Sequence, residues 1–483
     1  MSAARANRTL LALAGITAAA AALRFATLDL QSFWVDEGAT VQLLRGDFGE
    51  LLDGLTVTEK TPPLYYVLAW LWTQPFGTGE VGVRSLSALA GVLTVPVAFA
   101  LARDLVSARA GLVAAALVAV NPLLVWYSQE ARAYALVVLL SALATLYGVR
   151  AARGRDGALW RWALASALAL ATHYFALFAV APLALWVLMR SPERRRVQAA
   201  TGAIGATGLA LLPLAIDQSH NPGSNFITGT GLVTRVAQVP KQFLLGFDAP
   251  LEVAFTIGVL ALAAAGLWLA RGERGSHAAL ALGLAALGLP LVAAAAGADF
   301  VLARNLIVAL VPLLVVLAAG FSAARGAGAA LAGALVALSL ATVLAVFARP
   351  EFQRDDWRGA AEALGPAPVD RALVVNPIAG ATPLELYLDD LEPFGEEFRP
   401  VGEIALIAVA TRRPGETPRP PRPPSPSYLG YELAERREAD TFTLVRLRAV
   451  GEHRPIASAG LTAIKLVPGI DELAVTLMQP ARR

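Results

Sequence analysis

Long apolar stretches recur along this chain up to about position 347, and they constrain its fold more than any other feature. A helix needs about 20 apolar residues to cross the ~30 Å hydrocarbon core of a bilayer. Hydrophobic residues make up 56% of the 483 positions and charged residues 16%, against about 45–50% and about 25% in soluble chains. The sequence therefore predicts a polytopic α-helical membrane protein with about 11 transmembrane helices. The predicted spans lie at about 9–28, 83–102, 110–126, 133–149, 160–176, 177–189, 198–216, 251–270, 278–297, 304–322 and 327–347.

Arginines in the short loops indicate the orientation. If the N-terminus is cytoplasmic, every strongly basic loop lies inside, as the positive-inside rule requires. These loops hold Arg103, Arg109, Arg150, Arg153, Arg155, Arg161, Arg190, Arg194, Arg195, Arg196, Arg271, Arg274 and Arg325. The apolar run 63–72 is too short to cross, and its Tyr and Trp residues suit a helix lying along the outer surface. We therefore expect a multi-pass protein of the plasma (inner) membrane with a first outer loop at 29–82. Arg24 is expected to snorkel near the far end of the first span.

The composition changes near Arg349, where a polar segment begins. Residues 372–375 and 404–410 resemble buried strands, 431–447 a hairpin and 356–364 a helix, and a Pro-rich stretch occupies 414–426. We expect two domains, a transmembrane catalytic domain at 1–348 and a small α/β domain at 349–483. With eleven spans and a cytoplasmic N-terminus, the second domain is extracytoplasmic.

Several function classes are excluded by composition. The chain has no cysteine and four histidines, so thiol catalysis and a zinc site built by the protein are not expected. A net charge of +3 does not indicate nucleic acid binding, and no Walker-type or dinucleotide motif is present. No cofactor or metal site is predicted, although the acidic residues leave recruitment of a divalent cation open.

Ionisable and aromatic residues gather in the predicted outer loops, and their convergence on one face suggests a site. An adjacent acid pair, Asp36 and Glu37, suits a general base beside a second carboxylate. Arginine binds phosphate oxygens in a bidentate fork, and lysine meets a lipid phosphate at headgroup depth. Solvated acids, a structural salt bridge between Glu130 and Arg132, a snorkelling lysine and a structural histidine are the alternative interpretations. The candidate substrate-binding residues are Glu59, Lys60, Tyr65, Tyr127, Arg132, His173 and Arg304.

Six motifs in order resemble those of the GT-C glycosyltransferases, specifically the family 39 group. This group contains dolichyl-phosphate-mannose protein mannosyltransferases and bacterial aminoarabinose transferases that act on lipid A. The motifs are WVDEG (34–38), EKTPPLYY (59–66), VRSLSALAG (83–91), NPLLVWYSQEARAYAL (121–136), THYFALF (172–178) and RNLIVALVPLLVVLAAG (304–320). The C-terminal segment matches only loosely, and Asn305 stands where an aromatic residue is common.

The resemblance implies an inverting transferase that moves mannose or a related sugar from a polyprenyl-phosphate carrier to an extracytoplasmic glycan, lipid or protein. Asp36 matches the first-loop acid of the family, Glu130 falls where the second-loop acid is expected, and Lys60 and Arg304 match contacts to the carrier phosphate. Two alternatives stay open at this stage. One is a transporter or flippase of lipid-linked sugars, and the other is a relative that binds such lipids without turnover.

Overall fold

The chain forms two compact units in its computed structural model, and each unit is described by itself. The first comprises Met1–Leu28 and Leu43–Ala345, and the second Asp29–Gln42 and Val346–Arg483. The structure describes residues 3–221, 227, 229–388, 390–395, 397–409, 430–451, 453, 455–462 and 474–481. The predicted Pro-rich stretch at 414–426 lies outside these residues.

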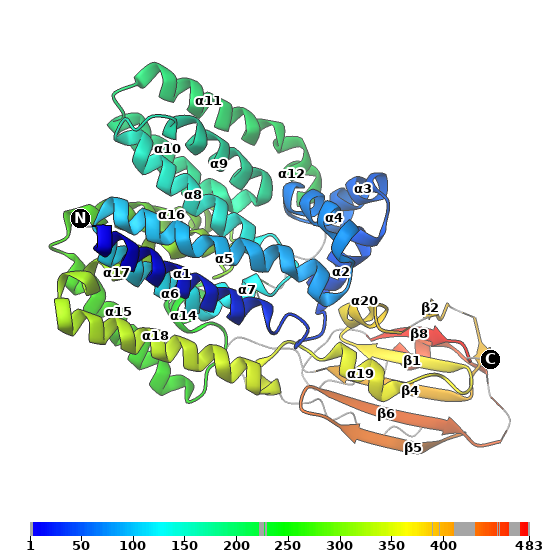
Figure 1. Ribbon diagram of the computed structural model, residues 1–483. Coiled ribbons are helices and arrows are strands. Elements are labelled where there is room, and N and C mark those ends of the chain that lie inside the picture. Colours follow the sequence, from blue (N-terminus) through cyan, green and yellow to red (C-terminus); the bar gives the residue numbers. More distant parts are fainter. Residues whose placement is uncertain are drawn as a thin grey trace. The chain divides into compact units, whose positions relative to one another are not determined.

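The first unit is a bundle of α-helices with short connections (Figure 1). Helices α5 and α8 form its centre, because 67% and 78% of their apolar windows are buried, against 6% for α1. The helices are α1 (Ala3–Phe25), α3 (Phe48–Thr58), α4 (Leu64–Phe76), α5 (Glu80–Leu105), α6 (Ala108–Val120), α7 (Pro122–Ser128), α8 (Tyr134–Ala152), α9 (Ala158–Thr172), η1 (Tyr174–Ala176), α10 (Leu177–Arg190), α11 (Arg194–Ala210), α12 (Leu212–Ser219), α14 (Leu232–Leu245), α15 (Glu252–Ala270), η2 (Arg274–Ser276), α16 (His277–Ala295), η3 (Ile307–Ala309), α17 (Leu310–Ala323) and α18 (Arg325–Ala348).

Every predicted span falls on an apolar helix of the structure. Among the described residues, seven helices are long and apolar enough to cross a membrane, and the bent pair α6–α7 makes an eighth if it is one span. The other three predicted spans correspond to shorter apolar helices at Ala158–Thr172, Tyr174–Arg190 and Ile307–Ala323. The polytopic helical fold is therefore confirmed. The predicted surface helix is α4, whose 13 residues are fewer than the about 20 that a span needs.

The bend between α6 and α7 shapes the first unit near the candidate site. The two helices meet at 58° around Asn121 and Pro122. Because Pro122 has no backbone N–H, the Val118 carbonyl loses its helical partner. The Asn121 side chain caps α7 by accepting a hydrogen bond from Leu124 N (3.0 Å), and its Nδ2 donates to the Phe243 carbonyl (2.7 Å). The break is thus stabilised on the α7 side by a polar side chain.

On the α6 side, the break is stabilised by Arg24 of α1. Its guanidinium donates to the carbonyls of Val118 (3.2 Å) and Ala119 (2.8 Å) and to Ser128 Oγ (3.1 Å). The side chain is fully buried, so the prediction that Arg24 snorkels to the membrane surface was wrong. Carbonyls freed within a bundle need a donor, and a buried guanidinium supplies several in one plane.

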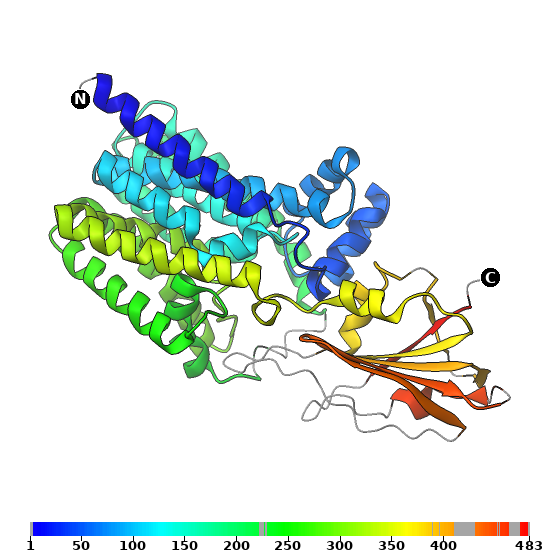
Figure 2. The ribbon, with the colours of Figure 1, turned by 60° about the horizontal axis from the view of Figure 1, so that its bottom comes forward.

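The second unit is a mixed sheet with helices on its faces (Figure 2). The strand order is β2-β8-β1-β4-β6-β5; β1 and β4 are parallel and the remaining pairs are antiparallel. Strands β3 (Arg399–Pro400) and β7 (Pro455–Ile456) form a separate small pair. The other elements are α2 (Val35–Arg45), whose last three residues belong to the first unit, η4 (Pro350–Phe352), α19 (Trp357–Leu364), β1 (Arg371–Asn376), η5 (Ile378–Gly380), α20 (Ala381–Leu384), β2 (Glu392–Pro393), β4 (Glu403–Val409), β5 (Tyr431–Glu438), β6 (Phe442–Ala449), α21 (Ser458–Thr462) and β8 (Val475–Gln479).

The predicted strands, hairpin and helix of this unit are confirmed. The central strands β1 and β4 are buried along their whole length, as runs of aliphatic residues predict for strands covered on both faces. One core contains Trp357 and Leu364 of α19, and the core on the opposite face contains Leu461 of α21. The small α/β architecture expected from the sequence is therefore correct.

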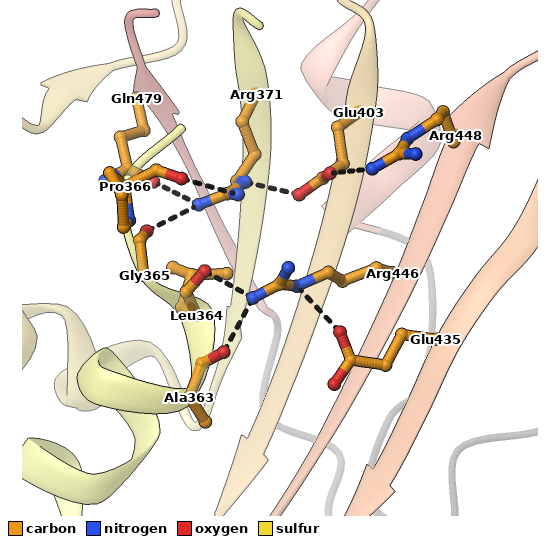
Figure 3. A network of polar contacts seen from close by, with 10 residues as sticks. All are labelled: Ala363, Leu364, Gly365, Pro366, Arg371, Glu403, Glu435, Arg446, Arg448 and Gln479. Atoms are coloured by element: carbon orange, nitrogen blue, oxygen red, sulfur yellow. Dashed lines mark hydrogen bonds and ion pairs between the residues drawn. The ribbon is translucent and has the colours of Figure 1, made fainter. Parts of the chain in front are cut away.

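A buried polar network joins the strands to the end of α19 (Figure 3). Arg371 and Glu403, whose side chains are both fully buried, form an ion pair of 2.5 Å between neighbouring strands. Arg371 also donates to Gly365 O (3.0 Å) and Gln479 Oε1 (2.7 Å). Arg446 donates to the carbonyls of Ala363 (2.6 Å) and Leu364. The arginines thus satisfy carbonyls at the C-terminal end of the helix, where positive charge is favourable.

Replacing Arg24 by methionine tests its role in the first unit. Arg24→Met removes the donors to the Val118 and Ala119 carbonyls, and each buried acceptor left without a partner costs about 1–3 kcal/mol. We expect the thermal unfolding midpoint of the detergent-solubilised protein to fall by several degrees. Arg8→Met, at an exposed position of the same helix, is the matched control and should leave the midpoint unchanged. Equal midpoints for the two variants would contradict the role assigned to Arg24.

Candidate active site

The turn between α7 and α8 holds two of the predicted residues, Glu130 and Arg132, and Tyr127 lies just before it at the end of α7. Gln129 anchors the turn, because its Nε2 donates to Thr27 Oγ1 (2.6 Å) and to the carbonyl of Arg24 (3.2 Å) at the end of α1. Glu130 is fully buried, and its carbonyl accepts a hydrogen bond from the Arg132 amide (2.8 Å). The turn is therefore anchored to the C-terminal end of α1.

Arg132 forms an ion pair with Glu59, the residue that directly follows α3. Arg132 Nη1 lies 2.6 Å from Glu59 Oε1, and the two side chains are 12% and 3% exposed. The guanidinium also lies over the Tyr66 ring, 5.9 Å from its centroid. Tyr65 reaches the same turn through Ser87, whose Oγ lies 3.2 Å from Tyr65 Oη and donates to the Arg132 carbonyl (3.3 Å). Glu59, Tyr65 and Arg132 are thus brought together.

Lys60 follows Glu59 in the connection between α3 and α4 and is exposed. Gln218 of α12 holds this connection by donating to the carbonyls of Leu55 (2.8 Å) and Thr61 (3.2 Å). Its own Oε1 accepts a hydrogen bond from Tyr174 Oη (2.9 Å). The backbone around Lys60 is therefore fixed while its side chain is exposed, an arrangement suited to contact with a lipid phosphate.

A row of rings connects Tyr127 to the loop before α17. Ring centroids are 4.6 Å apart for Tyr127 and Tyr134, 5.5 Å for Tyr134 and His173, 5.1 Å for His173 and Phe175, and 5.5 Å for Phe175 and Phe300. The row therefore joins α7, α8, the turn after α9 and the loop that carries Arg304. Tilted rings at these distances attract each other beyond their area burial.

His173 lies in the turn between α9 and η1, and its ring is neutral. The side chain is buried, with 5% of its surface exposed. Its Nδ1 accepts a hydrogen bond from Phe175 N (3.2 Å), so the ring proton is on Nε2.

The segment before Arg304 is fixed by a residue that the sequence analysis did not single out, Arg235 of α14. Its guanidinium pairs with both carboxylate oxygens of Asp299 and donates to the Val301 carbonyl (2.7 Å). The hydrogen bond from Arg235 holds the pKa of Asp299 below its usual value. Two features distinguish Arg235 from the other arginines: it lies in the amphipathic segment 232–245, and its side chain is only 5% exposed. Of these features, only the amphipathic pattern can be recognised in the sequence.

Asp36 and Glu37 belong to the second unit, where they occupy the first turn of α2. Asp36 is half-buried and Glu37 is fully buried. The Asp36 carbonyl accepts a hydrogen bond from Thr40 Oγ1 (3.1 Å) within the helix. Asp36 is therefore the more accessible carboxylate of the pair. Their catalytic roles stay predictions, as do those of the candidate residues in the first unit.

Comparisons with known proteins agree with this architecture. Residues 60–216 match the family model of the dolichyl-phosphate-mannose-protein mannosyltransferases, and this range includes the α7–α8 turn and His173. No curated protein matches the sequence.

Among solved structures, the chain is similar to ArnT from Cupriavidus metallidurans. The ArnT structure with bound undecaprenyl phosphate has a TM-score of 0.54 and 14% identity, over 90% of this chain and 97% of ArnT. The apo structure of ArnT gives a TM-score of 0.52 and 15% identity, over 92% and 98%. At these identities the likeness concerns the fold. The chain is a multi-pass membrane protein with the GT-C glycosyltransferase fold.

Proposed function

We propose that this protein transfers a sugar from a polyprenyl-phosphate carrier to an acceptor hydroxyl at the outer face of the membrane. The observation that carries the proposal is the likeness to ArnT over 90% of the chain, a protein whose structure holds undecaprenyl phosphate. The match to a family of mannosyltransferases that use dolichyl-phosphate-mannose supports it independently. The sugar and the acceptor stay open within this class.

In the proposed reaction, Asp36 removes the proton from the acceptor hydroxyl as its oxygen attacks the anomeric carbon. The bond from that carbon to the phosphate oxygen breaks, and the polyprenyl phosphate leaves with the bonding electrons. The configuration at the anomeric carbon is inverted. Positive charge near the leaving phosphate stabilises the charge that develops in the transition state. We assign this role to Lys60, Arg132 and Arg304.

The geometry of the first unit supports these assignments. Lys60 is exposed, Arg304 is half-buried, and both lie on segments whose backbone is held by neighbouring side chains, Gln218 and Arg235 respectively. A fixed backbone limits the entropy lost when a cation binds phosphate. Arg132 already pairs with Glu59, so its contact with phosphate requires the carrier to compete with this carboxylate.

Variants of the proposed base and variants of the proposed phosphate contacts should have different effects, and this difference tests the mechanism. Asp36→Asn should lower turnover by roughly 10²–10⁴, the usual contribution of general base catalysis, while leaving polyprenyl phosphate binding unchanged. Glu37→Gln should lower turnover less. Lys60→Ala and Arg304→Ala should weaken binding of polyprenyl phosphate, because a charge-assisted hydrogen bond contributes about 1.5–3 kcal/mol.

The measurements are turnover with one lipid-linked donor and equilibrium binding of the carrier, on folded protein of each variant. Near-normal turnover of Asp36→Asn would remove it as the base. Unchanged carrier affinity in both cation variants would remove Lys60 and Arg304 from the site.

We also propose that the N-terminus is cytoplasmic and the α/β unit extracytoplasmic in the plasma membrane, on the strength of the arginine-rich loops. The chain has no cysteine, so any labelling by a thiol reagent comes from the single cysteine that is introduced. Cysteine at Ser219 should react with an impermeant maleimide in intact cells, and cysteine at Asp156 only after permeabilisation. Both positions are exposed. Labelling of the Asp156 position in intact cells would reverse the orientation.

A further inference from the structure

The segment that carries Asp36 is built into the C-terminal unit of the chain. Residues Asp29–Gln42 cluster with Val346–Arg483, although more than 300 residues separate them in sequence. Within this unit the segment is fixed at its beginning by residues at and just before the start of α19, and at its middle and end by α20 and the turn that follows it. These contacts give the α/β unit a direct connection to the proposed base.

At its beginning, the segment caps helix α19. Ser32 Oγ donates to the Asp355 carbonyl (2.7 Å) and accepts a hydrogen bond from the amide of Trp357 (3.0 Å), the first residue of the helix. Gln31 Oε1 accepts from the amide of Arg354 (2.8 Å). The first amides of a helix have no hydrogen-bond acceptor within it. Ser32 supplies an acceptor for the first amide of α19, and the same hydrogen bond holds the segment in place.

In the middle, the Tyr387 hydroxyl accepts a hydrogen bond from the backbone amide of Phe33 (2.7 Å), and the two rings pack with centroids 6.1 Å apart. Phe33 lies three residues before Asp36 and two residues before Val35, the first residue of α2. A hydrogen bond to this amide therefore fixes where the helix that presents Asp36 begins.

At its end, the segment contacts α20 closely. A Cβ atom at Gly38 would lie 3.1 Å from the backbone nitrogen of Pro383, so the glycine that follows the acid pair permits this approach. Gln42 Nε2 donates to Glu385 Oε2 (3.0 Å). The helix carrying Asp36 is thus packed against a helix of the α/β unit.

We propose that the C-terminal unit positions the catalytic base, with Tyr387 as the positioning residue that acts through the Phe33 amide on Asp36. This inference rests on the proposed function, because it presupposes that Asp36 is the base. It assigns the α/β unit a part in the chemical step in addition to any part in acceptor binding. Tyr387 itself does not touch the substrate.

Tyr387→Phe tests the proposal, because it removes the hydroxyl and keeps the ring. We expect kcat to fall roughly 3- to 10-fold, the effect of one neutral hydrogen bond, with the KM for the donor unchanged. Tyr431→Phe is the matched control. Its hydroxyl donates to the Val401 carbonyl (2.7 Å) in the same unit, so the same atom is lost away from the segment, and kcat should stay at the wild-type value.

A double-mutant cycle distinguishes positioning from a general structural effect. If Tyr387 acts through Asp36, Tyr387→Phe should cause no further loss of turnover in the Asp36→Asn background. A full additional 3- to 10-fold loss in that background overturns the proposal. A wild-type kcat for Tyr387→Phe also overturns it. If Asp36→Asn shows its expected loss of turnover in the same assay, that outcome leaves the proposed function intact.

Hydrogen exchange gives a second readout that needs no activity. Tyr387→Phe should speed exchange in peptides that cover residues 29–42 of the full-length protein, and Tyr431→Phe should not. Unchanged exchange in these peptides contradicts the positioning role. If the wild-type protein lacks transferase activity, the proposed function fails, and the exchange result still decides whether Tyr387 orders this segment.

Discussion

The helical unit depends on the interaction of Arg24 with the broken end of α6. A proline in an apolar helix leaves a carbonyl without its partner, and inside a membrane protein no bulk water replaces it. Arg24 donates to the Val118 and Ala119 carbonyls from the neighbouring helix α1, which makes the 58° bend compatible with burial. The bend turns α7 so that it ends in the turn with Glu130 and Arg132. An arginine that looks like a membrane anchor in the sequence is thus a structural requirement of the candidate site.

Two further polar contacts extend this arrangement to other loops. The Glu59–Arg132 ion pair joins the connection between α3 and α4 to the α7–α8 turn, and the Arg235–Asp299 pair orders the segment before Arg304. Each arginine is nearly buried and has a carboxylate partner, which is the condition under which a charge is tolerated away from water. The loops of the first unit are therefore held by a small number of charge pairs, with a row of aromatic rings between them.

The sequence predicted the elements of both units well but not their long-range contacts. Apolar length locates the spans, and runs of aliphatic residues locate β1 and β4, because both signals are local. The motif at 121–136 opens with Asn121 and Pro122, yet the donor for the carbonyls that are free at this break lies almost 100 positions earlier, at Arg24. Likewise, no local pattern indicates that Asp36 is packed with the C-terminal unit or that Arg235 binds Asp299. The candidate residues could be identified from the chemistry of their side chains. The residues that contact them could be identified only from the fold.

The central claim is that the protein breaks the bond between a sugar and its lipid phosphate, and a direct measurement tests it. Purified full-length protein in lipid vesicles is incubated with a panel of polyprenyl-phosphate sugars and candidate acceptors. Free polyprenyl phosphate and the anomeric configuration of the product are then determined. The account predicts that one donor releases its carrier in amounts equal to the sugar transferred, with inverted configuration. Movement of intact lipid-linked sugar across the bilayer without any release of carrier would contradict it.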